Sequence, residues 1–448
     1  MSKKRRMTTA SCAPGSFVSC LRKFLTPAVY KQAHQARPTQ RASARWTVQP
    51  LLLVLLTMTW CSGDSQGERF ETARAFCIVL TPKRRRPGQS VTGFQQALSR
   101  LPAAVLRAVA AALRQQLLLR FGRHLDVEGF IPLGVDGSRL RCPRTAQLQQ
   151  RLGQAAQAEA PPQIWVTALV HLRLGLLWAW RLGRGDASER QHLQQLLPTL
   201  PDNALVVADA GYQGYDVTAA LMQAGVCFLI RVSTQTTLYS LEEVPATAWS
   251  DGWVYWWTTE AQKRKLPPLL LRLLRVHDSG RRQDVWLLTP VPGERLSLAM
   301  AGRFYKMRWE NEGFFRTYKR TLNKVKLSAR TVRLVHREAE GSLLAVQVLL
   351  AQGAWALVVL GQQPGAVSSP RGVLREIRRE IEARLGVRQQ RRFLQRLAQA
   401  HRERRLRRSS KVKQVWPSRA DHKPPKPPKL RTMSDELKAL VNKNLMAT

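Results

Sequence analysis

Hydrophobic residues change their spacing along the chain near residue 126. From 46 to about 125 they recur at helical intervals, in stretches rich in the strong helix formers Ala, Leu, Gln and Arg. Beyond residue 126, short runs of Val, Ile and Leu end at turn residues or at an acid, which is typical of strands. The pattern therefore predicts a helical N-terminal region, 46–125, followed by a part of the chain that contains strands.

Predicted strands and helices succeed one another closely over residues 126–232. The predicted strands are 130–138, 164–172, 176–180, 203–209 and 226–232, and the predicted helices are 186–197 and 216–224. Asp186 and Asp216 stand where the N-caps of these helices are expected. Strands in succession, followed by alternating helices and strands, predict an α/β fold in which helices flank a mixed sheet.

The chain changes character again after residue 232. Residues 233–300 carry Thr-, Ser- and Val-rich runs and predict a β-rich insertion, and helices resume over 301–360. Within the insertion, Trp253 and Trp257 would share one face of a strand, with Trp256 on the other. We expect these tryptophans to pack against the sheet.

The net charge is strongly and unevenly positive. Lys and Arg number 72 against 30 Asp and Glu, giving +42, while 44% of the residues are hydrophobic. Residues 1–50 hold ten bases and no acid, and residues 361–448 hold 23 bases and seven acids. Such an excess calls for a polyanionic partner, above all nucleic acid, and disfavours an ordinary metabolic enzyme. The hydrophobic content excludes disorder throughout.

Both ends of the chain are predicted to lie outside the folded body. Residues 1–45 lack periodicity and are expected to be loosely ordered. Residues 361–448 form a basic C-terminal tail, whose Arg391–Arg392 and Arg402–Arg408 clusters would bind DNA phosphates non-specifically or, as a weaker alternative, RNA. The Pro- and Lys-rich stretch 423–429 is typical of an extended linker.

Cysteine and histidine carry no recognisable metal motif. The six cysteines and eight histidines are scattered, without CxxC or HExxH spacing, which argues against a zinc module or a disulfide framework and leaves carboxylates as the ligands of any metal. Residues 46–63 are uncharged, but their dense apolar part is shorter than the ~20 residues that span a bilayer. A buried helix, and no membrane partner, is expected.

The segment 305–319 is the strongest candidate for chemistry. A helix turns by roughly 100° per residue, so it would place one acid, several bases and a tyrosine on the same face, within an arc of about 80° around its axis. These residues are Tyr305, Arg308, Glu312, Arg316 and Lys319. An adjoining arc would be apolar, with Asn311 as its one misfit. This face could be a solvated, salt-bridged surface; alternatively, a single carboxylate among bases suits a metal ion beside phosphates.

Two further acids, Asp136 and Asp209, end predicted apolar strands. The carboxyl ends of strands are where open α/β folds bind ligands. Two aspartates from strands and Glu312 from a helix could together hold two Mg²⁺ ions, which prefer hard oxygen ligands. Two such ions support phosphoryl transfer.

These motifs resemble those of a known family. Tyr305-x2-Arg308-x3-Glu312-x6-Lys319 matches the YREK signature of DDE transposases of the insertion-sequence-four family. The segments 135–138 (VDGS) and 207–215 (VADAGYQGY) are similar to the motifs that carry the family's two aspartates. The resemblance extends over roughly residues 46–360.

The resemblance implies a ribonuclease-H-like catalytic core interrupted by a β-rich insertion. It makes Asp136, Asp209 and Glu312 the catalytic, metal-binding triad, with two Mg²⁺ ions for which Mn²⁺ can substitute. Its basic and aromatic partners Tyr305, Arg308, Arg316 and Lys319 would then contact DNA. The implied reaction is cleavage of double-stranded DNA at transposon ends, followed by attack of the exposed 3′-hydroxyl on target DNA. A homodimer in the DNA complex and a location with the nucleoid in a prokaryotic cytoplasm are implied as well.

Two other functions remain open from the sequence. A transposase-derived DNA-binding protein without catalytic activity would keep the same basic surface, and a ribonuclease-H-like nuclease without strand transfer would need only the triad. The insertion tryptophans also have a second interpretation, since Trp253 and Trp257 could stack on a base flipped out of the duplex.

Overall fold

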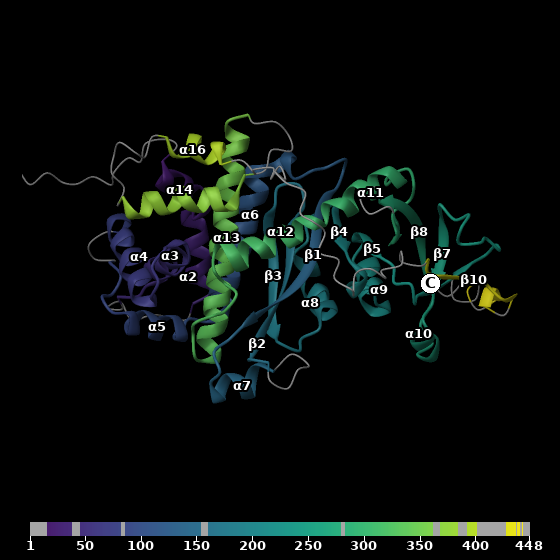
Figure 1. Cartoon of the computed structure of the whole chain (residues 1–448), viewed down its shortest axis with the longest axis horizontal. Helices are drawn as coiled ribbons and strands as arrows, with labels where there is room; N and C mark the ends of the chain where they lie inside the picture. The colour runs from purple at the N-terminus through teal and green to yellow at the C-terminus, as the bar shows by residue number, and fades with distance from the viewer. Residues whose placement is uncertain are drawn as a thin grey trace, which may run out of the picture.

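The computed structural model describes residues 16–37, 45–81, 86–153, 160–278, 283–361, 368–383, 392–400, 427–435, 437–439 and 441. Helices gather at one end of the molecule, and a long sheet runs from them to the other end (Figure 1). The predicted mixed α/β fold is confirmed.

Six α-helices lie within the described residues of the N-terminal part. They are α1 (Phe17–Phe24), α2 (Pro27–Gln35), α3 (Val48–Trp60), α4 (Gln66–Leu80), α5 (Val91–Arg100) and α6 (Ala103–Phe121). The hydroxyls of Ser16 and Thr26 cap α1 and α2. Almost every residue of α3 is buried, so the prediction of a buried helix in that segment is confirmed.

The expectation that residues 1–45 are loosely ordered is wrong over α1 and α2. Phe17 and Phe24 are fully buried, and the Phe17 ring lies 5.6 Å from Phe76 and 5.2 Å from Phe393. Helical amphipathicity within these two short helices was hidden by the basic residues around them. Residues 1–15 lie outside the described part of the chain.

The central sheet has the strand order β3-β2-β1-β4-β5. These strands are β1 (Ile131–Arg141), β2 (Gln163–His171), β3 (Leu176–Arg184), β4 (Ala204–Ala208) and β5 (Cys227–Arg231). β2 is antiparallel to β1 and β3, whereas β1, β4 and β5 run parallel. The helices between them are α7 (Ala146–Leu152), α8 (Glu189–Leu196) and α9 (Tyr215–Gln223). This order is that of a ribonuclease-H-like core, as predicted.

The β-rich insertion continues the same sheet. It contains β6 (Thr237–Ser240), β7 (Asp251–Trp256), α10 (Thr259–Lys263), β8 (Leu269–Asp278) and β9 (Gln283–Thr289). Because β9 pairs with β5, the insertion and core make one ten-stranded sheet, which β10 (Lys429–Thr432) completes beside β6. Trp256 and Trp257 are buried, as sheet packing requires, but Trp253 is 47% exposed. β7 ends at Trp256, so the expected shared face of Trp253 and Trp257 does not form.

The segment predicted as one helix over 305–319 is broken. α11 (Leu298–Met307) ends and α12 (Trp309–Arg316) begins at Arg308, and Thr317–Thr321 forms a π-helical turn. At the break, the Asn311 N–H donates to the Arg308 carbonyl, an i to i+3 bond. Phe304 packs in an apolar cluster with Val207, and Phe314 packs in the larger core. The uniform helical wheel was therefore wrong.

The longest helix, α13 (Val332–Val359), lies in the core. It is long and apolar enough to cross a membrane by composition, but 83% of its apolar window is buried inside the protein. α13 contacts helices of the N-terminal part and strand β3. Its hydrophobicity is therefore explained by burial within the protein.

The C-terminal region is only partly a tail. α14 (Pro370–Glu382) and α16 (Phe393–Gln399) pack on α13, and Ile377 and Leu397 are fully buried. The expected tail over 361–448 is thus wrong for these two helices, whose apolar faces the excess of Arg concealed. Arg391, the Arg402–Arg408 cluster and the start of the 423–429 stretch lie outside the described residues.

Candidate active site

The two candidate aspartates lie next to each other at the centre of the sheet. The parallel pairing of β1 with β4 ends at Gly134 opposite Val207, and Asp136 and Asp209 each follow two residues later. Asp209 directly follows β4, as predicted. Asp136 does not end its strand, because β1 stays paired with β2 as far as Arg141. What ends near Asp136 is only the pairing with β4, which opens the sheet at that point.

Each aspartate is oriented by a nearby glycine. The Gly137 N–H donates to Oδ1 of Asp136 at 2.8 Å, and the Gly211 N–H donates to Oδ1 of Asp209 at 2.9 Å. Neither carboxylate forms an ion pair with a described residue. Both therefore remain available to a cation.

Glu312 reaches the same region from α12, which crosses β1 and β2. The crossing is close because Gly134 has no side chain: a Cβ atom there would lie 2.5 Å from the Asn311 amide. Asn311 is fully buried at this contact, which explains its place among apolar residues. Glu312, the next residue, is exposed in the first turn of α12.

The charges of Asp209 and Glu312 act on the carboxylate of Asp136. Burial, together with the charges of Asp209 and Glu312, raises the pKa of Asp136 to about 6, against the lowering effects of the Gly137 hydrogen bond and Arg308. Burial and Arg141 lower the pKa of Lys319, while Asp136 acts in the opposite direction. The structure thus brings the three acids, Arg308 and Lys319 together.

Several polar atoms beside the carboxylates are buried without a partner. Among the described residues, no hydrogen bond is made by the Tyr305 hydroxyl, Nε of Arg308 or the side-chain amide of Asn311. The Arg308 guanidinium lies 5.6 Å from the Tyr305 ring centroid and 5.2 Å from that of Trp309. Unpaired buried polar atoms are costly, so their concentration here points to a ligand.

A basic cavity adjoins this cluster. It has a volume of about 540 Å³ between α11 and strands β5, β8 and β9, and the arginines and lysines that line it are Arg231, Arg275, Arg303, Lys306 and Arg308. Arg275 is paired with Asp284 and Arg303 with Glu128, so Arg231, Lys306 and Arg308 are the lining bases without an ion pair to a described residue. Arg316, by contrast, is exposed at the end of α12 and makes no ion pair within the described part of the chain. Of the predicted DNA contacts, Arg316 is the one that the structure does not draw into the cluster.

The carboxylates are not yet close enough to enclose a metal ion. Within the ranges that the structure describes, no three His, Cys, Asp or Glu side chains converge on one point at metal-binding distances. The donor set nevertheless suits a hard cation, because it consists of carboxylate oxygens that repel one another without a counter-ion.

Sequence reasoning missed one acid of this region, Glu189. The sequence suggested Asp186 as the cap of the following helix, but Ser188 caps α8 and Asp186 pairs with Arg184 at 3.1 Å. Burial and the charges of Asp136 and Asp209 raise the pKa of Glu189 to about 7. The sequence signal for a further acid was the glycine that follows each aspartate, at 137 and at 211. Both positions border the Glu189 carboxylate and leave space for it.

Asp216 is not an N-cap either. The N-cap of α9 is Gly214. Asp216 is the second residue of the helix and pairs with Arg264 at 3.0 Å. Neither acid competes with the candidate triad.

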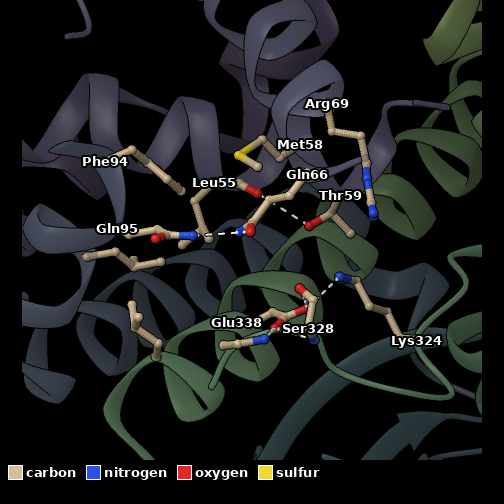
Figure 2. Close-up of a pocket in the computed structure, with 13 residues that line it drawn as sticks. Leu55, Met58, Thr59, Gln66, Arg69, Phe94, Gln95, Lys324, Ser328 and Glu338 are labelled. Carbon is tan, nitrogen blue, oxygen red and sulfur yellow. Dashed lines mark hydrogen bonds and ion pairs between the residues drawn. The ribbon is translucent and has the colours of Figure 1, made fainter. Parts of the chain in front are cut away.

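A second, smaller cavity lies away from these residues, between the N-terminal helices and the start of α13 (Figure 2). Its volume is about 60 Å³. The Lys324 ammonium lies 3.2 Å from the Glu338 carboxylate, which also accepts from the backbone N–H groups of Ser328 and Ala329. Lys324 and Glu338 are therefore satisfied by the protein itself, and neither of them needs a ligand in this cavity.

Comparisons with known proteins agree with the motifs. The transposase DDE domain family matches residues 133–348. The transposase InsG of insertion sequence element IS4, from Escherichia coli K12, is 27% identical over 319 residues, which are 68% of this chain and 70% of that protein. Together these two comparisons support a DDE transposase of the insertion-sequence-four family.

The region matched to the DDE family begins in β1 and ends in α13, so it includes all three acids of the candidate triad. A cryo-EM structure of the piggyBac transposase synaptic complex with hairpin DNA aligns with a TM-score of 0.42 and 10% identity, covering 84% of this chain and 83% of that one. The family membership inferred from the YREK signature is confirmed by the first two comparisons.

Proposed function

We propose that this transposase binds the terminal inverted repeats of an insertion sequence and cleaves and transfers DNA strands at Asp136, Asp209 and Glu312. The observation that carries the proposal is the placement of these carboxylates: Asp136 and Asp209 each follow the last residue of the β1–β4 pairing by two positions, and α12 brings Glu312 onto β1 next to the contact of Asn311 with Gly134. The charges of Asp209, Glu312 and Arg308 all act on Asp136, and that of Asp136 acts on Lys319. Acids that repel one another next to bases suit a site that holds cations and phosphates together.

The unpaired groups next to the acids support DNA as the ligand. A phosphate oxygen accepts hydrogen bonds from both a guanidinium and a phenol, which would satisfy Nε of Arg308 and the Tyr305 hydroxyl. The basic cavity beside them would continue the contact along the DNA backbone. Arg316 would contact DNA from the exposed end of α12.

Divalent cations complete the proposed site. Asp136, Asp209 and Glu312 would hold two Mg²⁺ ions, with Mn²⁺ as a substitute, and the ions would supply Lewis-acid stabilisation of the developing charge. Lys319 and Arg308 would orient the phosphate for in-line attack, first by water and then by the exposed 3′-hydroxyl. The active form would be a homodimer on paired element ends, associated with the nucleoid in a prokaryotic cytoplasm.

The test is strand cleavage of duplexes copied from the DNA that flanks the gene. We expect Mg²⁺-dependent nicking at the terminal repeats by the full-length protein, and its loss in Asp136→Ala, Asp209→Ala and Glu312→Ala. Asp202→Ala, which changes an exposed aspartate of the same core, is the control and should cleave normally. Undiminished cleavage by Glu312→Ala would remove Glu312 from the triad. Tight binding without cleavage in either metal would favour the alternative, a transposase-derived DNA-binding protein without catalysis.

A further inference from the structure

A fourth carboxylate, that of Glu189, enters the candidate site from the other side of the sheet. Leu205 and Val207 point to the face on which α11 packs, and Val206 points to the opposite face, with the residues of α8 and α9. Glu189 begins α8 and therefore approaches Asp136 and Asp209 from the face opposite to Glu312. The site would thus be lined by acids on both faces.

Two glycines make room for this side chain. A Cβ atom at Gly137 would overlap the Glu189 carboxylate, and a Cβ atom at Gly211 would lie 3.8 Å from Oε2 of Glu189 and 3.1 Å from Oδ1 of Asp209. Both carboxylates therefore border the same Gly211 position. A larger residue at 137 would push Glu189 out of this place.

The charges of Arg139 and Arg190 act to lower the pKa of Glu189, but both side chains donate their hydrogen bonds to backbone carbonyls instead of to its carboxylate. Nε of Arg190 donates to the Gly211 carbonyl at 3.0 Å, and Nε of Arg139 donates to the Gly185 carbonyl at 3.3 Å. The Arg139 guanidinium also lies 4.2 Å from the centroid of a Trp165 ring. The Glu189 carboxylate therefore forms no ion pair with a described residue. A half-buried carboxylate beside two others is costly unless a cation joins them.

A buried hydroxyl gives an independent indication of a ligand. Tyr212 is fully buried, and its hydroxyl makes no hydrogen bond of ordinary distance and angle with a described residue. The nearby hydroxyl of Thr167, which opposes the rise that burial causes in the pKa of Tyr212, is itself bonded to Nδ1 of His192 at 2.9 Å. The charges of Glu189, Asp136 and Asp209 all act on this hydroxyl, so it lies at the same cluster from the α8 face. A cation-bound water molecule there would give it a partner.

We propose that Glu189 is a fourth carboxylate ligand of the divalent cations that Asp136 and Asp209 hold. Two such cations carry one more positive charge than the triad can balance, and Glu189 supplies the missing negative charge from the opposite face. This assignment rests on the proposed function, because it concerns the same cation site.

A purely structural role for Glu189 makes a different prediction. The indole Nε1 of Trp165 is buried without a hydrogen-bond partner and borders the same Gly137 position, so Glu189 could serve only as its acceptor. Glu189→Gln keeps an acceptor oxygen and removes the charge, whereas Trp165→Phe removes the donor and keeps the charge. The two variants separate the roles.

The experiment is a titration of the full-length protein with Mn²⁺, in which the free ion is measured by electron paramagnetic resonance. We expect Glu189→Gln to weaken Mn²⁺ binding at least ~10-fold, as loss of a carboxylate from a metal site does, and Gly137→Ala to weaken it by displacing Glu189. Trp165→Phe and Glu260→Gln, an exposed glutamate of α10, should bind as the wild type does. Glu189→Cys should bind Cd²⁺ better than Mg²⁺, because a thiolate is a soft ligand.

Asp209→Asn distinguishes the two possible failures. If Asp209→Asn weakens Mn²⁺ binding and Glu189→Gln does not, Glu189 is not a ligand and the proposed triad stands. If neither variant weakens it, both the fourth ligand and the cation site itself are wrong. Thermal unfolding in metal-free buffer is expected to show each variant folded. If Glu189→Gln is unfolded, Glu189→Asp takes its place and should bind Mn²⁺ with an affinity between those of the wild type and a variant without the carboxylate.

Discussion

Two regions of this transposase hold partly or fully buried charged groups. The charges are paired within the protein in one region and lack an ion pair to any described residue in the other. Beside the small cavity, Lys324 is paired with Glu338, whose second oxygen accepts two backbone N–H groups (Figure 2). At the candidate site, burial and the charge of Asp209 raise the pKa of Asp136 and that of Glu189. These three carboxylates form no ion pair with a described residue, although Arg308 lies near enough to act on Asp136, and Arg139 and Arg190 near enough to act on Glu189. The Tyr305 hydroxyl also lacks a partner among the described residues. Burial alone therefore does not indicate function. The distinguishing property is whether the folded chain itself satisfies the buried group.

The same contrast is seen among the C-terminal helices and in the insertion. Arg396 bonds to both Glu376 and Glu380, and Arg272 is held by Asp251 and two backbone carbonyls. These ion pairs join helices or strands and give each of these carboxylates an arginine as counter-charge, although Oε2 of Glu380 makes no hydrogen bond to a described residue. If paired charges hold the fold while unpaired ones do the chemistry, substitutions in the two regions should have opposite effects on stability and on cleavage.

The largest effect is expected from Asp136→Asn. The variant keeps an oxygen that can accept from the Gly137 N–H but loses the charge, and several kcal/mol of cation-mediated stabilisation correspond to a loss of cleavage of about 10³-fold. Because the charge is opposed by its neighbours in the metal-free protein, the melting temperature should not fall. Single-turnover cleavage and thermal unfolding of the same preparation measure the two effects. A large loss of stability would assign Asp136 to the structural class instead.

The reverse result is expected from Glu338→Ala. Removing one partner of a buried pair leaves Lys324, which is 8% exposed, without a counter-charge and should lower the free energy of unfolding by about 3–5 kcal/mol. Urea unfolding measures this loss. The double variant Lys324→Met, Glu338→Leu should recover most of it. Unchanged stability in the single variant would contradict the comparison.

A somewhat smaller effect is expected from pH, through His171. Its Nδ1 accepts from the Leu174 N–H, so Nε2 carries the proton and donates to the Leu125 carbonyl at 2.8 Å. Burial lowers the pKa of His171 to about 4, from 6.5. The folded state therefore favours the neutral ring, and this stabilisation, about 3 kcal/mol, is complete above pH 6.5 and is lost as pH falls toward 4.

Urea unfolding between pH 4 and 7.5 checks this expectation, with His171→Gln as the reference. The wild type should lose about 3 kcal/mol more than the variant over this interval, since other titrating groups are common to both proteins. Parallel pH profiles would show that His171 titrates normally.

The smallest effect is expected from Lys319→Ala. If Lys319 contacts one phosphate, the variant should bind element ends more weakly, and the slope of log K against log salt should decrease by ~1. Lys31→Ala, which changes an exposed lysine of α2, should leave the slope unchanged on short end duplexes. An unaltered slope in Lys319→Ala would mean that this lysine faces protein or solvent.

The sequence determined the order of the core elements and the identity of the triad candidates. Hydrophobic runs marked β4 and β5 because strands buried on both faces are continuously apolar, and the spacing of Tyr305, Arg308, Glu312 and Lys319 pointed to the family. These features are local: each depends on residues within one strand or helix. They could therefore be recognised without knowledge of the rest of the fold.

Only the tertiary structure decided which of these residues meet. Nothing local to Asn311 reveals that it packs on Gly134, and nothing local to Glu189 reveals Asp136 and Asp209 as its neighbours. The same limit explains the wrong predictions for α1, α2, α14 and α16, because surrounding basic residues hid apolar faces that pack on other helices: α1, α14 and α16 contact α13, and α2 contacts α6. The burial of a side chain, its hydrogen-bond partners and the charges that act on it all depend on contacts between segments that are remote in sequence. Those contacts exist only once the chain has folded.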